Sequence, residues 1–417
     1  MSSRRVNPPF RAEHIGSLLR PPQLFEKRRQ FEAGQCSVEE LKSAEDSAVK
    51  AVVQMQQDAG IKSITDGELR RGFYFEGVFD KLEGMTFIPN RPLVEYKPYI
   101  PFVTALEAMG VAEFPSVYCT GKIKRVTRWY AEQFMALKSL VPPEDVKNLK
   151  VTMCPPTWFH QRHGSSLTYD LSVYKNDEEY FNDLAKAYQE EIQDLYDLGC
   201  RNIQFDDATF CFFCDERMVS GMKAVGDDYD TLLDTYVRAI NAAVRGRNAD
   251  MTVGVHMCRG NFTGGLHYAE GGYTRIAQKV FTELDVDCFY LEYDSDRAGD
   301  FQPLKFLPLD KIAVLGLVTT KNSKLEDIEM LKARINEAAE IISKEGIPAR
   351  SKEVALDQYV NNSSGLYEPS IWGITELRPI LGYVSVRSAA SRRYGRDQRE
   401  KLRLVVETAK QVWGGIA

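Results

Sequence analysis

No apolar run in this sequence approaches the roughly 18 residues that a membrane-spanning helix needs. The chain begins with the charged stretch MSSRRVNPP, which lacks the apolar core of a secretory signal peptide. Its eight cysteines are scattered and do not show the spacing of a disulfide framework, which fits a reducing compartment. From these absences we expect a cytoplasmic, water-soluble protein without a membrane partner.

An excess of positive charge is absent as well. The 53 Lys and Arg residues against 59 Asp and Glu residues give a net charge of -6, so there is no general attraction to nucleic acid. Internal repeats and low-complexity tracts are also missing. With 417 residues, 44% of them hydrophobic, the chain can bury a large core. Length alone suggests two or three domains, but α/β barrels often exceed about 250 residues as one domain.

Short apolar or β-branched runs alternate with amphipathic stretches along the chain, and this alternation predicts βα units and a parallel sheet. Candidate strands end within residues 14–17, 64–68, 151–155, 203–207, 253–258, 289–292, 312–317 and 354–360. The predicted helices include 177–198, 226–248, 270–284, 324–345 and 399–412.

Eight such repeats close into a (β/α)8 barrel, whose active site lies at the carboxyl ends of the strands. An open doubly wound sheet would give the same alternation. Polar clusters follow all eight candidate strands, and this favours the barrel. We therefore expect residues 1–417 to form a single (β/α)8 TIM barrel domain.

Two stretches are too long to be simple loops. Residues 69–149, between the second and third strands, are rich in Phe, Tyr and Pro and contain a strand-like segment near 115–127. We expect them to form an inserted segment, with a hairpin and helices, near the barrel mouth. The second stretch, 366–397, ends in an Arg-rich run from Arg387 to Arg396, which is typical of a solvated surface or of a contact in a homo-oligomer.

A candidate metal site lies at the end of the strand that contains His256 and Cys258. Strand side chains alternate between faces, so these two side chains point the same way. An imidazole, a thiolate and the carboxylate of Glu292, at the next strand end, suit zinc. The alternative is a buried His and Cys that are merely packed.

Acidic side chains follow two other strands. Asp66-Gly67-Glu68 places carboxylates beside a glycine that allows a tight turn, and Asp206-Asp207 point to opposite faces, so only one enters the mouth. Carboxylates that face a pocket suit a substrate amino group, whereas the alternative is N-capping of the next helix.

The turn of His14, Ile15, Gly16 and Ser17 offers backbone N–H groups and a hydroxyl to an anion such as a carboxylate, unless it is a simple connecting turn.

Aromatic and imidazole groups follow the third strand. Trp158 suits stacking on a flat ligand, and His160 and His163 suit proton transfer. The alternative is a packed Trp with solvated His side chains. The pair Cys211 and Cys214 has the spacing of half a zinc knuckle or of a redox pair, but the bulky apolar residues between them favour packing.

Five motifs together resemble the catalytic barrel of the cobalamin-independent methionine synthases, and in particular their short, stand-alone branch. The resemblance extends from about residue 8 to residue 415. The motifs, all at predicted strand ends, are His14-Ile-Gly-Ser17, Asp66-Gly-Glu68, Gln204-Phe-Asp-Asp207, His256-Met-Cys-Arg-Gly-Asn261 and Tyr290-Leu-Glu-Tyr293.

The resemblance implies a zinc-dependent S-methyltransferase. In that family zinc binds the thiol of homocysteine, and the sulfur takes a methyl group from a methyltetrahydrofolate. By motif, His256, Cys258 and Glu292 match zinc ligands. Glu68 and Asp206 match the groups that hold the ammonium of the amino acid. Residues 15–17 match the turn that receives its carboxylate.

Two departures from the family pattern concern the chemistry. Ser364 occupies the position of a further Cys ligand, and a hydroxyl is a far poorer zinc ligand than a thiolate. The stretch Leu317 to Lys321 lacks the His that the family carries there as a proposed acid, so His160 or His163 becomes the candidate proton donor.

Three functions remain open from the sequence. The first is methyl or alkyl transfer to a thiol with zinc. The second is a different reaction, a lyase step or a thiol addition, on an amino-acid-like substrate in secondary metabolism. The third is a binding or regulatory protein that senses an amino acid.

Overall fold

The structure is a computed structural model of the chain. It describes residues 7–72, 74–108, 110–260, 267, 269–364 and 388–416, with the backbone alone for 363, 364 and 388–396. In this part of the chain, no helix is long and apolar enough to cross a membrane.

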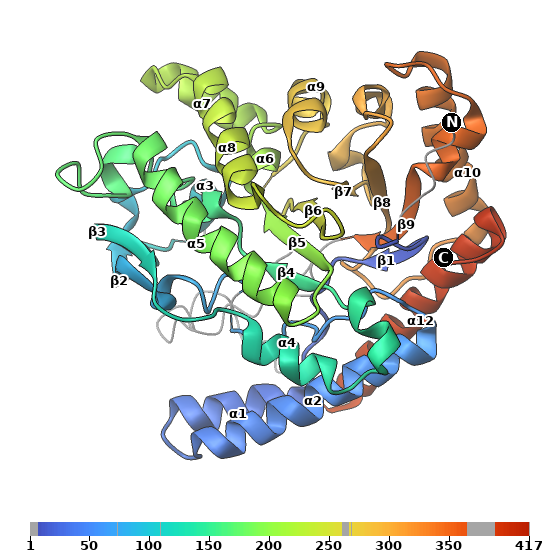
Figure 1. Cartoon of the computed structure of the whole chain (residues 1–417), viewed down its shortest axis with the longest axis horizontal. Helices are drawn as coiled ribbons and strands as arrows, with labels where there is room; N and C mark the ends of the chain where they lie inside the picture. The colour runs from blue at the N-terminus through green and yellow to red at the C-terminus, as the bar shows by residue number, and fades with distance from the viewer. Residues whose placement is uncertain are drawn as a thin grey trace.

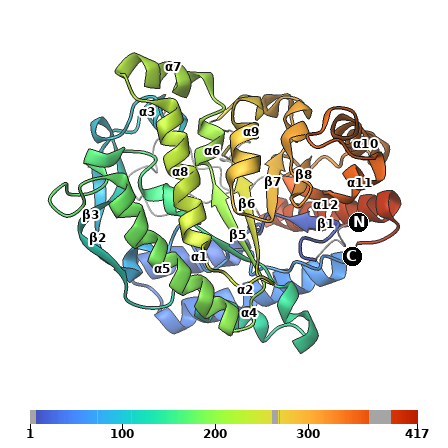
Figure 2. The same ribbon diagram turned by 45° about the horizontal axis from the view of Figure 1, so that its top comes forward.

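A parallel sheet lies at the centre of the molecule (Figure 1). Within the described residues it has seven strands, in the spatial order β1-β9-β8-β7-β6-β5-β4. The sheet curls, and helices cover its outer side (Figure 2), which is the architecture of the predicted α/β barrel. The strands are β1 (Ala12–His14), β4 (Val151–Met153), β5 (Asn202–Asp207), β6 (Thr252–Met257), β7 (Cys288–Glu292), β8 (Ile312–Thr319) and β9 (Tyr359–Ser364).

The second of the eight predicted strands, 64–68, is not a regular strand, and this prediction was wrong in detail. The segment nevertheless lies between the two edge strands: Lys150, just before β4, donates its N–H to the Ile64 carbonyl at 3.0 Å. Leu18, after β1, donates to the Gly67 carbonyl at 3.0 Å. Gly67 (φ 69°) and Glu68 (φ 57°) have left-handed backbones, which end any extended strand at this point.

The predicted helices are confirmed. Their ends shift by at most about four residues, except that the last helix begins at Ser388 and not at 399. The helices that follow the central strands are α5 (Asp177–Asp197), α6 (Thr209–Phe212), α7 (Glu216–Val225), α8 (Tyr229–Val244), α9 (Thr274–Glu283), α10 (Ile328–Glu345), α11 (Lys352–Asp357) and α12 (Ser388–Trp413). The last predicted strand began too early, because Ser351 caps α11 through the Val354 N–H and makes residues 352–357 helical.

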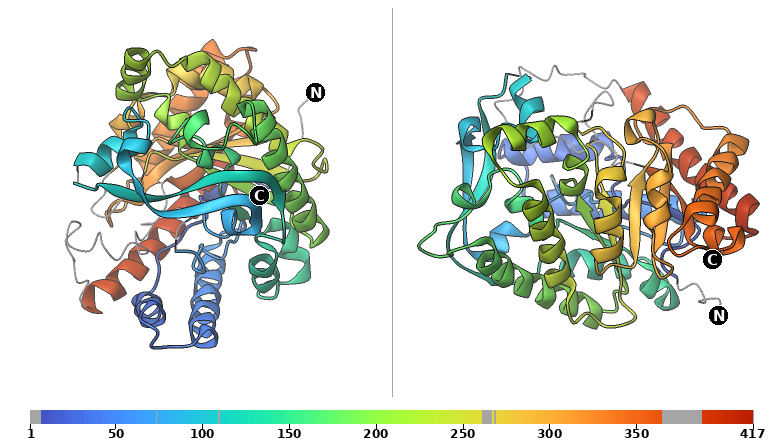
Figure 3. Two further views of the ribbon diagram at one scale, coloured as in Figure 1. Left: turned by 90° about the vertical axis from the view of Figure 1, so that its left-hand side faces the viewer. Right: turned by 90° about the horizontal axis from the view of Figure 1, so that it is seen from above.

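The N-terminal helices α1 (Pro22–Glu32) and α2 (Val38–Ala59) extend from the body of the molecule (Figure 3). A capping box starts α2: Glu40 donates its N–H to the Ser37 hydroxyl at 3.2 Å, and its carboxylate accepts from the Ser37 N–H at 2.8 Å. Gly60, with φ 87°, ends the helix. Helix α12 packs against α2, and the Arg11 N–H donates to the Ile416 carbonyl at 3.0 Å, which joins the first and last described segments.

The stretch 69–149 contains an antiparallel hairpin and helices, as its pattern indicated. Its elements are β2 (Leu82–Pro92), α3 (Pro101–Ala108), β3 (Glu113–Arg125) and α4 (Ala131–Lys138). The hairpin contacts the loop that follows the carboxyl end of β4. Cys119 donates its N–H to the Thr168 carbonyl at 2.9 Å, and Lys97 donates to the Arg162 carbonyl at 2.8 Å.

A buried ion pair lies inside the barrel. The Lys150 ammonium is 3.0 Å from the Glu13 carboxylate, and both side chains are 0% exposed. The Glu13 carboxylate also accepts from the Phe10 N–H, and the Lys150 ammonium lies 3.4 Å from the Tyr290 hydroxyl. Each charge is therefore compensated only as long as the other is present.

We expect Glu13→Gln to lower the free energy of unfolding by about 3–5 kcal/mol, because it leaves the Lys150 ammonium buried without its counter-charge. Denaturant unfolding measures this loss. The matched control is Glu400→Gln at the exposed Arg403–Glu400 pair, for which we expect a change below about 1 kcal/mol. Equal effects of the two variants would contradict the prediction.

Candidate functional site

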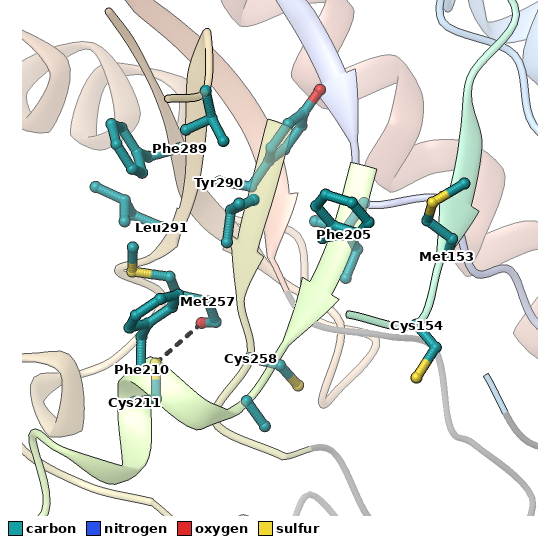
Figure 4. Close-up of a cluster of buried hydrophobic side chains, with 14 of the residues drawn as sticks. Met153, Cys154, Phe205, Phe210, Cys211, Met257, Cys258, Phe289, Tyr290 and Leu291 are labelled. Carbon is teal, nitrogen blue, oxygen red and sulfur yellow. Dashed lines mark hydrogen bonds between the residues drawn. The ribbon is translucent and has the colours of Figure 1, made fainter. Parts of the chain in front are cut away.

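Three potential metal ligands meet at the carboxyl ends of β6 and β7. One ligand atom each of His256, Cys258 and Glu292 lies within 4.8 Å of the other two, and all three residues are buried. Alternation along the strands explains this arrangement. Phe289 and Leu291 project to one side of β7 among other apolar side chains (Figure 4). Glu292 is one residue further along, so its side chain points to the opposite side of the strand.

The imidazole of His256 lies between two carboxylates. Its Nδ1 is 3.1 Å from Asp206 Oδ1, and its Nε2 is 3.4 Å from Glu292 Oε1. The first contact follows from strand register, since Asp206 pairs directly with His256 across β5 and β6. Burial alone would lower the pKa of His256, but the two acidic neighbours raise it to about 9.

Asp206 is itself held in place. The Gln204 amide donates to Asp206 Oδ1 at 2.7 Å and to the Ile15 carbonyl at 2.7 Å, which ties the end of β5 to the turn after β1. The neighbouring Asp207 points to the other face, as alternation requires, where its carboxylate accepts from Thr157 at 2.9 Å and from Thr209. Of these two aspartates, therefore, only Asp206 contacts His256.

Two cations contact Glu292, and the sequence did not single out either of them. Arg297 Nη2 is 2.8 Å from Glu292 Oε2, and Lys321 Nζ is 3.8 Å from the same oxygen. Burial alone would raise the pKa of Glu292, but Lys321, His256 and Arg297 together hold it well below its usual range. The sequence indicates these contacts only weakly: one basic residue follows the end of β7 and another follows the end of β8.

The donor set fits a metal ion. Three buried side-chain atoms at this place make no hydrogen bond to any described residue: His256 Nε2, Glu292 Oε1 and Asp206 Oδ2. Leaving such atoms unpaired costs about 1–3 kcal/mol each, and a cation next to them removes that cost. Burial and the charge of Glu292 raise the pKa of the Cys258 thiol to about 12, so it becomes a thiolate only beside a positive charge. Nitrogen, sulfur and oxygen donors together suit zinc.

Glu68 lies close to this centre. Its carboxylate accepts from the Thr152 hydroxyl at 2.6 Å and lies 3.9 Å from Arg71 Nη1. Burial raises the pKa of Glu68 to about 7; Arg71 and Arg20 oppose the rise, and the charge of Asp206 adds to it. The two acids that the sequence assigned to an ammonium group are thus near one another.

The turn after β1 is tightly built. His14 Nε2 contacts the Ser63 carbonyl at 3.1 Å, and the Gly16 N–H donates to His14 Nδ1 at 3.2 Å. Gly16 has φ 107°, and a Cβ there would come within 2.2 Å of Thr152. The turn is therefore fixed beside Glu68, but the Gly16 N–H is already engaged. Ser17 is buried next to it.

His160 and His163 lie in the loop after β4 and are not brought into the cluster. His160 contacts the Tyr236 hydroxyl at 2.9 Å and Asp177 at 3.0 Å, so both ring nitrogens are engaged. His163 contacts Ser116 at 2.6 Å and the Glu95 carbonyl at 2.9 Å. These contacts join the loop to α5, α8 and the hairpin, and they favour a structural role. Proton donation by either residue stays a prediction.

Trp158 lines a cavity of about 30 Å³ between the loop after β4 and the hairpin. Phe75 stacks on the indole at 4.9 Å, and the Arg162 guanidinium lies 3.7 Å from the ring centroid. The Phe75 ring and the Arg162 guanidinium already contact the indole in this arrangement, and stacking of Trp158 on a flat ligand stays a prediction.

Ser364 is the last residue of β9, and its Cα pairs with that of Thr319 on β8. The side chain of Ser364, and residues 365–387, lie outside the described part of the chain. The backbone register places Ser364 beside the strand end that leads to Lys321, which contacts Glu292.

The geometry agrees with the comparisons with known proteins. A family model described as the catalytic domain of cobalamin-independent synthase matches residues 164–350, a range that includes Asp206, His256, Cys258 and Glu292. The uncharacterized protein YxjH of Bacillus subtilis is 32% identical over 406 residues, which cover 97% of this chain and 95% of that protein. The chain belongs to the cobalamin-independent methionine synthase family.

Further relatives agree with this assignment. A methionine synthase of Saccharolobus solfataricus is 26% identical over 363 residues, which cover 84% of this chain and 92% of that protein. The crystal structure of a putative vitamin-B12-independent methionine synthase from Listeria monocytogenes superposes with a TM-score of 0.70 at 29% identity, over 99% of this chain and 100% of the other. A B12-independent methionine synthase from Shewanella, with a TM-score of 0.60 at 17% identity over 91% of this chain and 90% of the other, shares the fold.

We expect His160→Gln to lower the free energy of unfolding by about 1–3 kcal/mol, because the Tyr236 and Asp177 side chains lose a buried partner. Denaturant unfolding is the measurement. The control is His267→Gln at a partly exposed His that contacts Glu270, with an expected change within about 0.5 kcal/mol. Unchanged stability in His160→Gln would show that these contacts do not support the loop.

Proposed function

We propose that this protein transfers a methyl group to the sulfur of a homocysteine-like amino acid, with zinc held by His256, Cys258 and Glu292. The observation that carries the proposal is the meeting of three different donors, two of them with unpaired buried atoms, in a member of the methionine synthase family. When bound, zinc would stabilise the substrate sulfur as a thiolate at neutral pH. A centre with three protein ligands leaves a position for that sulfur.

The substrate ammonium would bind between Glu68 and Asp206. Asp206 Oδ2 is buried and has no hydrogen-bond partner among the described residues, although Oδ1 is engaged by Gln204 and His256. An ammonium group there would pair with this oxygen. It would also reduce the repulsion between Glu68 and Asp206, which adds to the effect of burial in raising the pKa of Glu68. The same contact would place the substrate sulfur near the ligands.

The substrate carboxylate would bind at the turn of Ile15, Gly16 and Ser17. The Gly16 N–H already donates to His14, so the other polar groups of the turn would receive the carboxylate. Because Gln204 joins the Ile15 carbonyl to Asp206, the places for the ammonium and the carboxylate are held at one spacing. A rigid spacing of this kind favours one length of amino acid.

The methyl donor that we propose is N5-methyltetrahydrofolate. A sulfur–carbon bond forms while the N5–carbon bond breaks, the electron pair of the broken bond stays on N5, and N5 takes a proton. The donor of this proton stays a prediction: His160 is a candidate only if its contacts with Tyr236 and Asp177 are broken. Glu68 is not a candidate, because in this proposal its carboxylate binds the substrate ammonium.

We expect the purified protein to hold about one zinc ion per chain and to methylate homocysteine. Cys258→Ser should lose at least about 100-fold in methyl transfer, because changes outside the ligand shell already cost about 10- to 100-fold. Metal analysis and detection of methionine are the measurements. The matched control is Cys200→Ser, at a buried thiol at the opposite end of β5, which should keep its zinc and its activity.

The zinc affinity of Ser364→Cys tests whether the serine at this position weakens zinc binding. A gain in zinc affinity of about tenfold or more would mean that the site lacks a thiolate that the strand can supply. A wild-type protein without zinc that does not methylate the thiol would contradict the proposal.

We expect the KM for the amino-acid thiol to rise about tenfold between pH 8 and pH 6. Glu68 has a raised pKa of about 7, so the carboxylate that attracts the ammonium is present above this pH and is lost as the pH falls. Glu68→Gln should have a high KM that changes little over this range. Metal content is measured at each pH, and an identical pH profile in this variant would exclude Glu68 as the cause.

A further inference from the structure

Two acids and two cations form a buried network beside the proposed zinc centre. The acids are Glu292, at the end of β7, and Asp294, two residues later. The cations are Arg297, in the short turn Asp296–Ala298, and Lys321, after β8. The four side chains are at most 11% exposed. Buried charges of this kind persist only when each of them is paired.

The two acids share the cations unequally. Asp294 is paired at both oxygens: Oδ1 lies 3.4 Å from Arg297, and Oδ2 lies 2.7 Å from Lys321 and accepts from the Thr319 hydroxyl at 2.8 Å. Glu292 contacts these two cations through one oxygen only. Its Oε2 contacts Arg297 at 2.8 Å and Lys321 at 3.8 Å, whereas Oε1 makes no hydrogen bond.

The unpaired oxygen is the one that faces the other ligands. Glu292 Oε1 lies 3.4 Å from His256 Nε2, and neither atom makes a hydrogen bond to another described residue. A carboxylate can rotate about its terminal torsion, and this rotation exchanges its two oxygens. The contact with Arg297 at Oε2 removes that freedom, and Asp294 in turn holds the two cations where they are.

We infer that Arg297 and Lys321 are positioning residues that hold Glu292 Oε2, so that Oε1 stays directed at the metal position beside His256 and Cys258. The inference rests on the proposed function. It assigns to the loops after β7 and β8 a role in metal affinity. These cations also compensate the charge that a carboxylate brings into a buried centre.

The alternative is that Arg297 and Lys321 only join two loops through Asp294. A structural role of this kind would change the stability of the protein without acting through Glu292. The two explanations therefore differ in how a change at Arg297 combines with a change at Glu292.

The test measures the affinity of the full chain for Zn²⁺ alone, in competition with a chromophoric chelator. We expect Arg297→Gln to weaken zinc binding about 10- to 100-fold, the usual range for residues that orient a ligand. Arg297→Lys keeps the charge and should recover part of the affinity. In a Glu292→Gln background, Arg297→Gln should have little further effect, because the carboxylate through which it acts has been removed.

The matched control is Arg275→Gln, at an exposed arginine that pairs with Glu216 at 2.6 Å, and it should bind zinc like the wild type. If Arg297→Gln does not fold, Lys321→Met provides the same test, with an expected loss of up to about tenfold. Co²⁺-loaded protein gives a second readout, since its visible spectrum changes when a carboxylate ligand moves.

Wild-type zinc affinity in both Arg297→Gln and Lys321→Met would overturn this inference and leave the proposed function intact. An equal loss of zinc affinity from Arg297→Gln in the wild-type and in the Glu292→Gln background would overturn it as well. A wild-type chain that binds no zinc would overturn the proposed function and this inference together.

Discussion

The lateral register of three parallel strands is the constraint on which the site depends. Asp206 on β5 pairs directly with His256 on β6, and β7 ends beside them with Glu292. Backbone hydrogen bonds fix this register, and a shift by one residue would turn every side chain to the other face. The contacts of His256 with its two acidic neighbours follow from this pairing, and so does the distance from Cys258.

Polar groups inside the barrel are arranged in two different ways. At one end, Glu13 and Lys150 satisfy each other and are closed to ligands. At the carboxyl ends of the strands, His256, Asp206 and Glu292 each keep one buried atom without a hydrogen bond to the described part of the chain. The first arrangement stabilises the barrel. The second arrangement leaves buried polar atoms without partners, which is typical of a site that binds a ligand or an ion.

Much of the architecture could be predicted from the sequence. The alternation of apolar runs and amphipathic stretches was sufficient for the parallel sheet and for α5, α8, α9 and α10. It failed where local geometry overrides hydrophobic pattern. The left-handed backbones of Gly67 and Glu68 prevent a regular strand at 64–68, and the Ser351 cap makes residues 352–357 helical although 354–357 were predicted to begin a strand.

The sequence by itself determined which residues of the centre share a face, because His256 and Cys258 are two positions apart on one strand. The position of Glu292 at the end of the next strand added the third residue. Only the tertiary structure decided which side chains complete the centre: Arg297 and Lys321 meet Glu292 from two loops. It also placed His160 and His163 against Tyr236 and Ser116. Periodicity reports the direction of a side chain from its own element, whereas a contact between loops depends on how separate elements pack.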